Sequence, residues 1–279
     1  MRNLIIRSAS GIVFLSVMLA CILGGAIPYA CLMLFILIGM MYEFYKLTLG
    51  KKNYLQKTIG TATGIICWLA FFPPLACNNS FTSLLVIAFV LWIALLIQQL
   101  YQKNEQTFAA IAYTLLGFMY IALPLSLMNM IAYNFENEYD GKLLLGLFII
   151  LWCSDVGAYV FGMAFGQKGK HKLFPGISPK KSWEGFAGGL LLALCTGYLM
   201  SCFGFIAYGA VHALIISGLI AVFGVFGDLV ESMLKRSAGV KDSGKIMPGH
   251  GGLLDRFDAA LIALPAVWCY IFMINELNL

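Results

Sequence analysis

Long apolar runs, separated by short polar segments, make up most of this chain. A helix needs about 20 apolar residues to cross the hydrocarbon core of a bilayer, and nine runs approach or reach that length. They are residues 4–25, 27–45, 58–77, 81–100, 107–133, 143–166, 185–205, 209–231 and 257–275. The pattern predicts an all-α, polytopic integral membrane protein with about nine transmembrane helices.

Two of the nine runs need a further comment. The first follows Arg2 and Arg7 and ends in small residues, as a signal peptide does. We interpret it as a transmembrane helix because eight more apolar runs follow. The fifth run contains Pro124, which predicts a kink because proline removes a helical hydrogen bond.

The positions of the basic residues predict the orientation in the membrane. Cytoplasmic loops keep an excess of Lys and Arg during insertion. With nine helices, all but one of the 18 Lys and Arg residues fall on the same side, the exception being Lys142. We therefore expect the N-terminus to lie inside and the C-terminus outside.

Composition excludes several classes of protein. The 279 residues are 61% hydrophobic and 11% charged, and the mean hydropathy is +0.88, whereas about a quarter of the residues of a soluble domain are charged. A soluble enzyme, a nucleic-acid-binding protein and a disordered chain are excluded. The 8 cysteines lie singly in or beside apolar runs, which indicates small buried residues rather than disulfides or zinc ligands.

No internal repeat or linker marks a second domain. We expect one membrane domain over residues 1–279, with N-terminal helices in 1–133 and a catalytic half in 143–275. Two polar, Gly-rich segments, 166–184 and 232–256, are the predicted inner loops of that half. They adjoin the apolar runs that contain acidic residues, so chemistry is expected there.

Acidic residues inside membrane spans are costly and are therefore candidates for function. Asp155 lies in the middle of the sixth run. Asp228, Glu231, Ser232 and Lys235 have the spacing i, i+3, i+4 and i+7, which places them on one helical face. The structural alternative is that these acids only form ion pairs with nearby lysines.

The segment after this face combines glycines with further acids. Glycines 244, 249, 251 and 252 allow the backbone to approach a ligand. Asp255 and Asp258, three residues apart, are expected to point the same way. Carboxylates with basic residues between them suit Mg²⁺ and a polyphosphate, whereas zinc prefers His and Cys. His250 is a candidate phosphate donor or proton carrier, or a residue that only shapes the loop.

The other inner segment contains Ser178-Pro179-Lys180-Lys181. Lysines at this depth would meet lipid headgroups or a nucleotide triphosphate. The alternative is that they serve only as a signal for orientation.

Residues 232–258 resemble the signature of the phosphatidate cytidylyltransferases, also called CDP-diacylglycerol synthases. The segment Ser232-Met233-Leu234-Lys235-Arg236, then Lys241-Asp242 and Pro248-Gly249-His250-Gly251-Gly252-Leu253-Leu254-Asp255-Arg256-Phe257-Asp258 carries the resemblance. Residues 178–185 and 155–159 are also similar to segments of that family. The N-terminal half is similar only in being a series of apolar spans.

The resemblance implies transfer of CMP from CTP to phosphatidate, giving CDP-diacylglycerol and pyrophosphate, with Mg²⁺ and with K⁺ as a candidate second ion. It implies metal ligation by Asp228 and Asp255, with Glu231 and Asp258 as further ligands. It implies catalytic roles for Asp228, Asp255, Lys235 and Arg256. It implies substrate binding by Ser178, Lys180, Lys181, Arg236, Lys241 and His250.

Three other functions remain as alternatives. The first is a cytidylyltransferase for another lipid phosphate, and the second an ion-coupled transporter. A transporter predicts inverted repeats with acids in both halves, but in the first four spans the sole acid is Glu43. The third alternative is a structural or lipid-binding role.

The expected partners are CTP, phosphatidate and membrane lipids, without nucleic acid, and a homodimer is left open. The expected location is a bacterial inner membrane, crossed many times.

Overall fold

The computed structural model describes residues 2–50, 53–76, 80–101, 107–134, 137–166, 171–247, 249 and 251–277. His250 lies outside the described residues. The helices are α1 (Arg2–Leu23), α2 (Ala26–Thr48), α3 (Tyr54–Ala70), α4 (Pro73–Ala76), α5 (Ser80–Leu100), α6 (Thr107–Gly117), α7 (Leu123–Ala132), α8 (Gly141–Phe161), α9 (Trp183–Cys202), α10 (Ala210–Ser237), α11 (Leu254–Phe257) and α12 (Ala260–Leu277). The π-helical segments are η1 (Phe118–Ala122) and η2 (Gly162–Gly166), and the strands are β1 (Lys172–Phe174) and β2 (Ser178–Ser182).

Within the described residues, 7 helical stretches are long and apolar enough to cross a membrane. They are Ala26–Thr48, Ser80–Leu100, Phe108–Ala132, Gly141–Gly166, Trp183–Cys202, Ala210–Ser237 and Leu254–Leu277. Each of the nine predicted runs contains helix. Two of these helices are too short to count among the seven: α3 has 17 residues, and the apolar part of α1 is limited to Ala9–Leu23. A mostly helical, polytopic membrane protein is confirmed, whereas the number nine and the orientation stay predictions.

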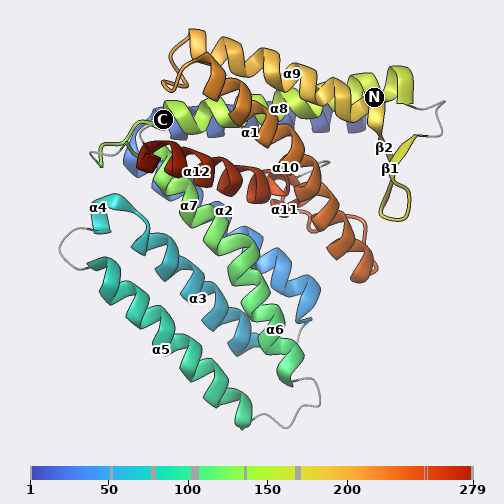
Figure 1. The fold of residues 1–279 in the computed structure, drawn as a ribbon. Helices are drawn as coiled ribbons and strands as arrows, with labels where there is room; N and C mark the ends of the chain where they lie inside the picture. The colour runs from blue at the N-terminus through green and yellow to red at the C-terminus, as the bar shows by residue number, and fades with distance from the viewer. Residues whose placement is uncertain are drawn as a thin grey trace. The chain divides into compact units, whose positions relative to one another are not determined.

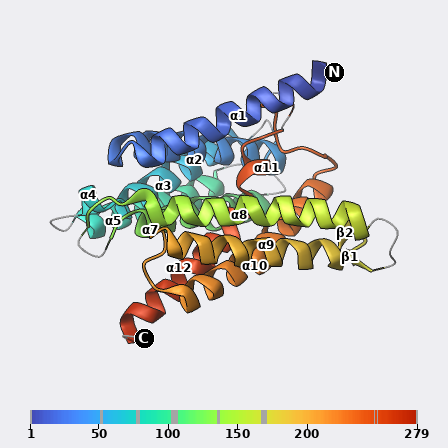
Figure 2. The same ribbon diagram turned by 90° about the horizontal axis from the view of Figure 1, so that it is seen from above.

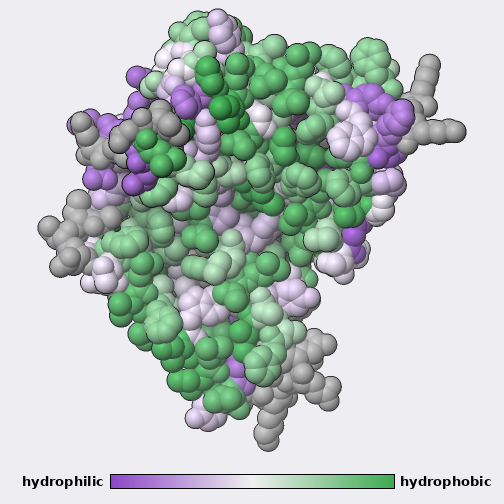
Figure 3. Space-filling view, viewed as in Figure 1, coloured by the Kyte–Doolittle hydropathy of each residue, from purple (hydrophilic) through white to green (hydrophobic). Residues whose placement is uncertain are grey.

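The surface agrees with burial in lipid. The helix Ser80–Leu100 buries only 11% of its most apolar stretch inside the protein, and Phe89, Phe108 and Phe165 are largely exposed. Hydrophobic residues predominate on the face shown in Figure 3. Exposed apolar area of this extent is typical of a surface that contacts lipid rather than water.

The predicted irregularity in the fifth run takes the form of η1, which directly precedes the turn containing Pro124. The backbone N–H of Leu123 donates to the oxygen of Phe118, five residues back, instead of four. Proline has no N–H to offer at the next position. The wider turn is a common response of a helix to such a missing donor.

The chain divides into two compact units. The first, called here the N-terminal unit, comprises Met1–Tyr139 and Asp242–Asp255. The second, called the C-terminal unit, comprises Asp140–Lys241 and Arg256–Leu279.

The N-terminal unit is built around α2, on which one face is fully buried, including Tyr29, Phe44 and Tyr45. Helices α3 and α5 lie side by side in Figure 1. The hydroxyl of Tyr29 donates to Asn129 Oδ1 over 2.8 Å, and Asn129 Nδ2 donates to the carbonyl of Trp68 over 3.1 Å. Inside a bilayer such polar groups must find partners within the protein, and here they do.

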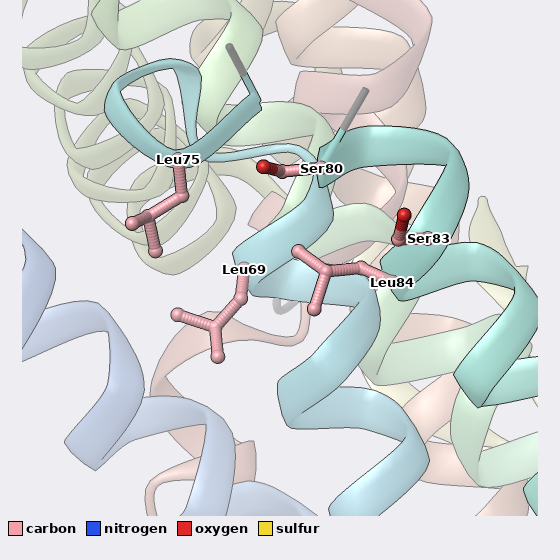
Figure 4. Close-up of a pocket in the computed structure, with 5 residues that line it drawn as sticks. All are labelled: Leu69, Leu75, Ser80, Ser83 and Leu84. Atoms are coloured by element: carbon pink, nitrogen blue, oxygen red, sulfur yellow. The ribbon is translucent and has the colours of Figure 1, made fainter. Parts of the chain in front are cut away.

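A pocket opens near the end of α3 and the start of α5 in this unit. Its lining residues are Leu69, Leu75, Ser80, Ser83 and Leu84, and Figure 4 shows the two serine hydroxyls among leucine side chains. The lining carries no ionisable group.

The C-terminal unit depends on close contact between α8 and α9, which lie side by side in both Figure 1 and Figure 2. A Cβ atom added at Gly157 would lie 2.6 Å from the carbonyl oxygen of Gly188, and one at Gly189 would lie 2.9 Å from that of Ser154. Distances below 3.0 Å are not tolerated by real Cβ atoms. Glycine at these positions lets the two backbones touch, as in other membrane helix pairs.

A short antiparallel hairpin of β1 and β2 precedes α9, with Phe174 opposite Ser178 and Lys172 opposite Ser182. It extends from one end of the α8 and α9 pair (Figures 1 and 2). The sequence pattern does not predict this hairpin within the segment 166–184.

Candidate functional site

Helix α10 carries the polar face that the sequence indicates. The hydroxyl of Ser232 donates to Asp228 Oδ1 over 3.1 Å, and Lys235 forms an ion pair with Glu231 one turn earlier. The side chain of Glu231 is 0% exposed. These contacts within one 28-residue helix place the four residues together, as their spacing predicts.

Asp258 can approach this face because Gly227 has no side chain to cover the backbone of α10. A Cβ atom at Gly227 would lie 2.4 Å from the carbonyl oxygen of Asp258, so only glycine permits the contact. As a result, carboxylate oxygens of Asp228, Glu231 and Asp258 lie within 4.8 Å of one another. We call these three residues the carboxylate cluster.

The conformation at Asp258 differs from the predicted regular helix over 257–275. Helix α11 ends at Phe257 and α12 begins at Ala260, with Asp258 in the turn between them. Its Oδ1 accepts a hydrogen bond of 2.8 Å from the N–H of Ala259. The carboxylate thus lies at the N-terminus of α12, where the helix dipole favours negative charge.

Lys181 joins the carboxylate cluster from strand β2. Its Nζ lies 2.7 Å from Asp228 Oδ2 and donates to the carbonyl of Val225 over 3.4 Å. Successive side chains of a strand point to opposite sides, and Lys180 is accordingly exposed. The hairpin therefore separates two lysines that the sequence presents as a pair.

Asp155 of α8 is also near. Its carboxylate is close enough to interact electrostatically with Asp228, Lys181 and Arg256. It also interacts electrostatically with Asp258. Carboxylates this close repel one another, and a bound cation relieves such repulsion. The sequence singles out Asp155, and the structure adds it to the surroundings of the carboxylate cluster.

Asp255 belongs to the N-terminal unit. Its Oδ2 accepts hydrogen bonds from Ser243 N (2.9 Å), Ser243 Oγ (2.9 Å) and Gly252 N (2.8 Å). Three donors fix the orientation of this carboxylate. These donors come from both ends of the described part of segment 242–255.

The remaining proposed residues are placed as follows. Ser178 begins β2 opposite Phe174, and Arg256 is exposed within α11. Arg236 is exposed and donates from Nη1 to the carbonyl of Val240 over 3.3 Å. Lys241 is exposed. The structure therefore gathers Asp228, Glu231, Asp258, Lys181 and Lys235, and does not bring Lys180 or Arg236 into contact with them.

One residue that the sequence interpretation missed is Ser182. Its Oγ accepts a hydrogen bond of 3.2 Å from the N–H of Gly185 and so caps α9, with Glu184 in the first turn. A serine followed by an acid within one turn is a typical helix start, so this signal was available. The cap ends β2 and thereby fixes the register of Lys181.

The donor set fits a divalent metal ion. Three carboxylates with converging oxygens are hard ligands, which suit Mg²⁺ far better than Zn²⁺. The ion pairs of Lys181 and Lys235 show that the structural alternative also holds, since both acids on α10 have lysine partners. A metal ion and the lysines need not exclude each other, because a site for polyphosphate requires both kinds of cation.

Comparison with known proteins assigns the chain to a group. A model of the cytidylyltransferase family matches residues 5–274. The phosphatidate cytidylyltransferase of Staphylococcus saprophyticus is 40% identical over 184 residues, 66% of each chain and so just under two thirds. That of Staphylococcus haemolyticus is 39% identical over 189 residues, 67% of this chain and 68% of the relative.

A third relative is similar along nearly its whole length. The phosphatidate cytidylyltransferase of Bacillus subtilis is 32% identical over 267 residues, which is 94% of this chain and 95% of that protein. Because both this alignment and the family model cover the carboxylate cluster and almost all of the helices, the chain belongs to the cytidylyltransferase family.

Proposed function

We propose that this protein is a phosphatidate cytidylyltransferase, which transfers CMP from CTP to phosphatidate and releases pyrophosphate. The observation that carries the proposal is the carboxylate cluster with Lys181 and Lys235, in a chain similar over 94% of its length to a bacterial protein of that name. Neither part alone identifies the substrates. The similarity suggests the reaction, and the carboxylate cluster with its two lysines is a site that suits the chemistry of that reaction.

The reaction makes particular demands on such a site. The phosphate of phosphatidate is already an anion, so it needs no strong base to become a nucleophile. The barrier arises from repulsion between this anion and the triphosphate, and from charge that gathers on the departing pyrophosphate. Cationic groups reduce both contributions, and Lys181 and Lys235, beside the carboxylate cluster, would provide them.

Asp228, Glu231 and Asp258 would hold Mg²⁺ in the C-terminal unit, and Asp255 is the further ligand that we propose from the sequence. Once bound, the ion would neutralise phosphate oxygens and the leaving group. Lys181 and Lys235 would donate to phosphate oxygens, leaving their present carboxylate partners. Lys180, Arg236, Lys241 and Arg256, all exposed, are proposed to attract the two anionic substrates.

We further propose nine membrane spans with the N-terminus in the cytoplasm of a bacterium, where CTP is available. The basic segments support this orientation, and the relatives are bacterial. In this arrangement phosphatidate would keep its acyl chains in the inner leaflet while its phosphate reaches the site.

The test uses the purified protein in detergent with CTP labelled in its α-phosphate. Phosphatidate should yield labelled lipid and one pyrophosphate per lipid, and a chelator should stop the reaction until Mg²⁺ is added. An isoprenoid monophosphate, offered separately, should give little product. Labelling of the isoprenoid alone would transfer the proposal to another lipid phosphate, and no labelling of either lipid would overturn it.

A further inference from the structure

Helix α2 carries a buried acid that the proposed reaction does not use. Glu43 is 1% exposed. Its Oε2 accepts a hydrogen bond from the N–H of Leu254 (2.9 Å) and lies 3.2 Å from the hydroxyl oxygen of Ser243, whose one proton is shared between Glu43 and Asp255 as alternative acceptors. All four residues belong to the N-terminal unit. Burying a carboxylate costs free energy that its hydrogen-bond donors offset only in part. A buried acid at this position therefore points to a role beyond packing.

Ser243, Gly244, Gly252 and Leu254, on both sides of the undescribed residues of segment 242–255, lie directly against this carboxylate. A Cβ atom at Gly244 would lie 2.0 Å from Glu43 Oε1, and one at Gly252 would lie 2.3 Å from Oε2. The sequence suggests that these glycines admit a ligand. The structure gives another reason for both, because the space that a side chain would need is filled by Glu43.

Ser243 connects Glu43 to Asp255. Its hydroxyl oxygen lies 3.2 Å from Glu43 Oε2 and 2.9 Å from Asp255 Oδ2. The N–H groups of Ser243 and Gly252 donate to Asp255, whereas that of Leu254 donates to Glu43. The two carboxylates therefore hold the same short segment from two directions.

We propose that Glu43 is a positioning residue for the reaction: it holds segment 242–255 in place and, through the hydroxyl of Ser243, orients the carboxylate of Asp255. The inference rests on the proposed function only in assuming that Asp255 acts in the reaction. The proposed role of Glu43 is to hold other groups in place rather than to bind substrate or metal. Groups that orient a ligand in this way commonly affect metal affinity or activity by about 10- to 100-fold.

A glutamate is required at this position for a geometric reason. Aspartate is one methylene shorter and would not reach both donors. In Glu43→Gln the amide oxygen still accepts from the N–H of Leu254 and lies beside the hydroxyl of Ser243, but the NH₂ group takes the place of Oε1 against Gly244. No hydrogen-bond partner of Oε1 is found among the described residues, so a buried NH₂ there would lack an acceptor and would push the segment away.

The first experiment measures hydrogen exchange of the intact protein in detergent, without substrates. In Glu43→Gln the amides of Ser243, Gly252 and Leu254 should exchange at least about 10-fold faster, because their acceptors have moved, while those of α9 stay unchanged. Unaltered exchange in segment 242–255 would overturn the proposal. This result does not depend on enzymatic activity.

The second experiment measures activity against Mg²⁺ concentration. Glu43→Gln should raise the Mg²⁺ needed for half-maximal activity by about 10-fold, and Glu43→Asp should recover little of the loss. Ser243→Ala should have a similar effect, and the double variant should be no worse than the poorer single one, because both changes break one connection. Multiplicative losses in the double variant would refute the connection through Ser243.

A matched control separates positioning from general stability. Asn129→Leu removes another buried polar side chain of the N-terminal unit, one that contacts Tyr29 and Trp68. It should lower thermal stability without changing the Mg²⁺ requirement, and an equal change in that requirement would reduce Glu43 to a structural role. If the wild-type protein made no lipid product, the proposed function would fail, while hydrogen exchange would still decide whether Glu43 positions the segment.

Discussion

The position of a lysine within strand β2 decides whether it contacts the carboxylate cluster, as Lys181 shows. Its Nζ contacts Asp228, whereas its neighbour Lys180 is exposed. We predict that Lys181→Ala lowers kcat/KM by about 10²-fold and raises the KM of one substrate more than the other, since a phosphate contact serves only its own substrate. Initial rates with each substrate varied in turn check this.

The control for Lys181 is Lys142→Ala, which removes an exposed lysine at the start of α8. It should leave both KM values unchanged. If the two variants were equally and mildly affected, the lysines of β2 would serve only to orient the protein in the membrane.

Asp228 supports a second prediction. Asp228→Asn keeps the volume of the side chain but removes a charged oxygen from the carboxylate cluster. Activity should fall by on the order of 10²- to 10³-fold or more, with the protein still folded in membranes, and Asp255→Asn should behave similarly. Activity assays with Mg²⁺ titration give the measurement, and Glu276→Gln, an exposed acid of α12, is the control that should stay active.

The sequence predicts part of this site and not the rest, for physical reasons. The α10 face follows from spacing, because a helix repeats every 3.6 residues and brings Glu231 and Lys235 together whatever surrounds them. The approach of Asp258 depends on a backbone contact at Gly227, which no local pattern reveals. Likewise the sequence shows Glu43 only as the single acid of the first four predicted spans. Its partners Ser243 and Leu254 are 200 and 211 residues away in the chain.

At the scale of elements, the α8 and α9 pair should tolerate no side chain at its contact. Gly157→Val would place Cβ 2.6 Å from the carbonyl oxygen of Gly188 and force the helices apart. We predict a loss of at least about 2 kcal/mol in stability, in the range of severe overpacking, visible as earlier thermal unfolding in detergent.

Gly218 of α10 is the matched control for this change. Among the described residues, no atom outside the adjacent backbone of α10 itself lies within 4 Å of a Cβ added there. Gly218→Ala should therefore be neutral or stabilise the protein by up to about 1 kcal/mol, because alanine favours helix over glycine. If Gly157→Val and Gly218→Ala unfolded at the same temperature, close packing of α8 on α9 would not contribute to stability.

Elements were predictable where the apolar run itself dictates a helix, as in α5 and α10. Elements were not predictable where a few residues change the path of the backbone. The hairpin of β1 and β2 is short and polar, and Pro179 within it indicates a turn rather than a strand. The break at Asp258 interrupts a run that is otherwise helical in character, because the turn is set by the contact with Gly227 rather than by a helix-breaking residue.

At the scale of the whole molecule, orientation remains to be measured. Reporter fusions after residues 175 and 245 should both indicate the cytoplasm, and a fusion after residue 138 the opposite side, since Lys and Arg concentrate in cytoplasmic loops. Opposite signals at 175 and 245 would contradict the proposed site, because the basic segments would then lie on different sides of the membrane.

The division into two units could not be predicted from the sequence. Segment 242–255 follows α10 directly, yet it belongs with residues 1–139. Apolar periodicity reports only on neighbours along the chain, whereas Ser243 and Leu254 of this segment contact Glu43, two hundred or more residues earlier.

Those long-range hydrogen bonds have a consequence for biosynthesis. Glu43 is separated from Ser243 by 200 residues and from Leu254 by 211. At about 5–20 residues per second, a ribosome reaches these partners roughly 10–40 s after it has made α2. During that interval a nascent membrane helix carries a carboxylate without its final donors. A chain that stops before residue 243 never acquires them, and we expect the cell's membrane proteases to recognise such truncated chains by this exposed acid.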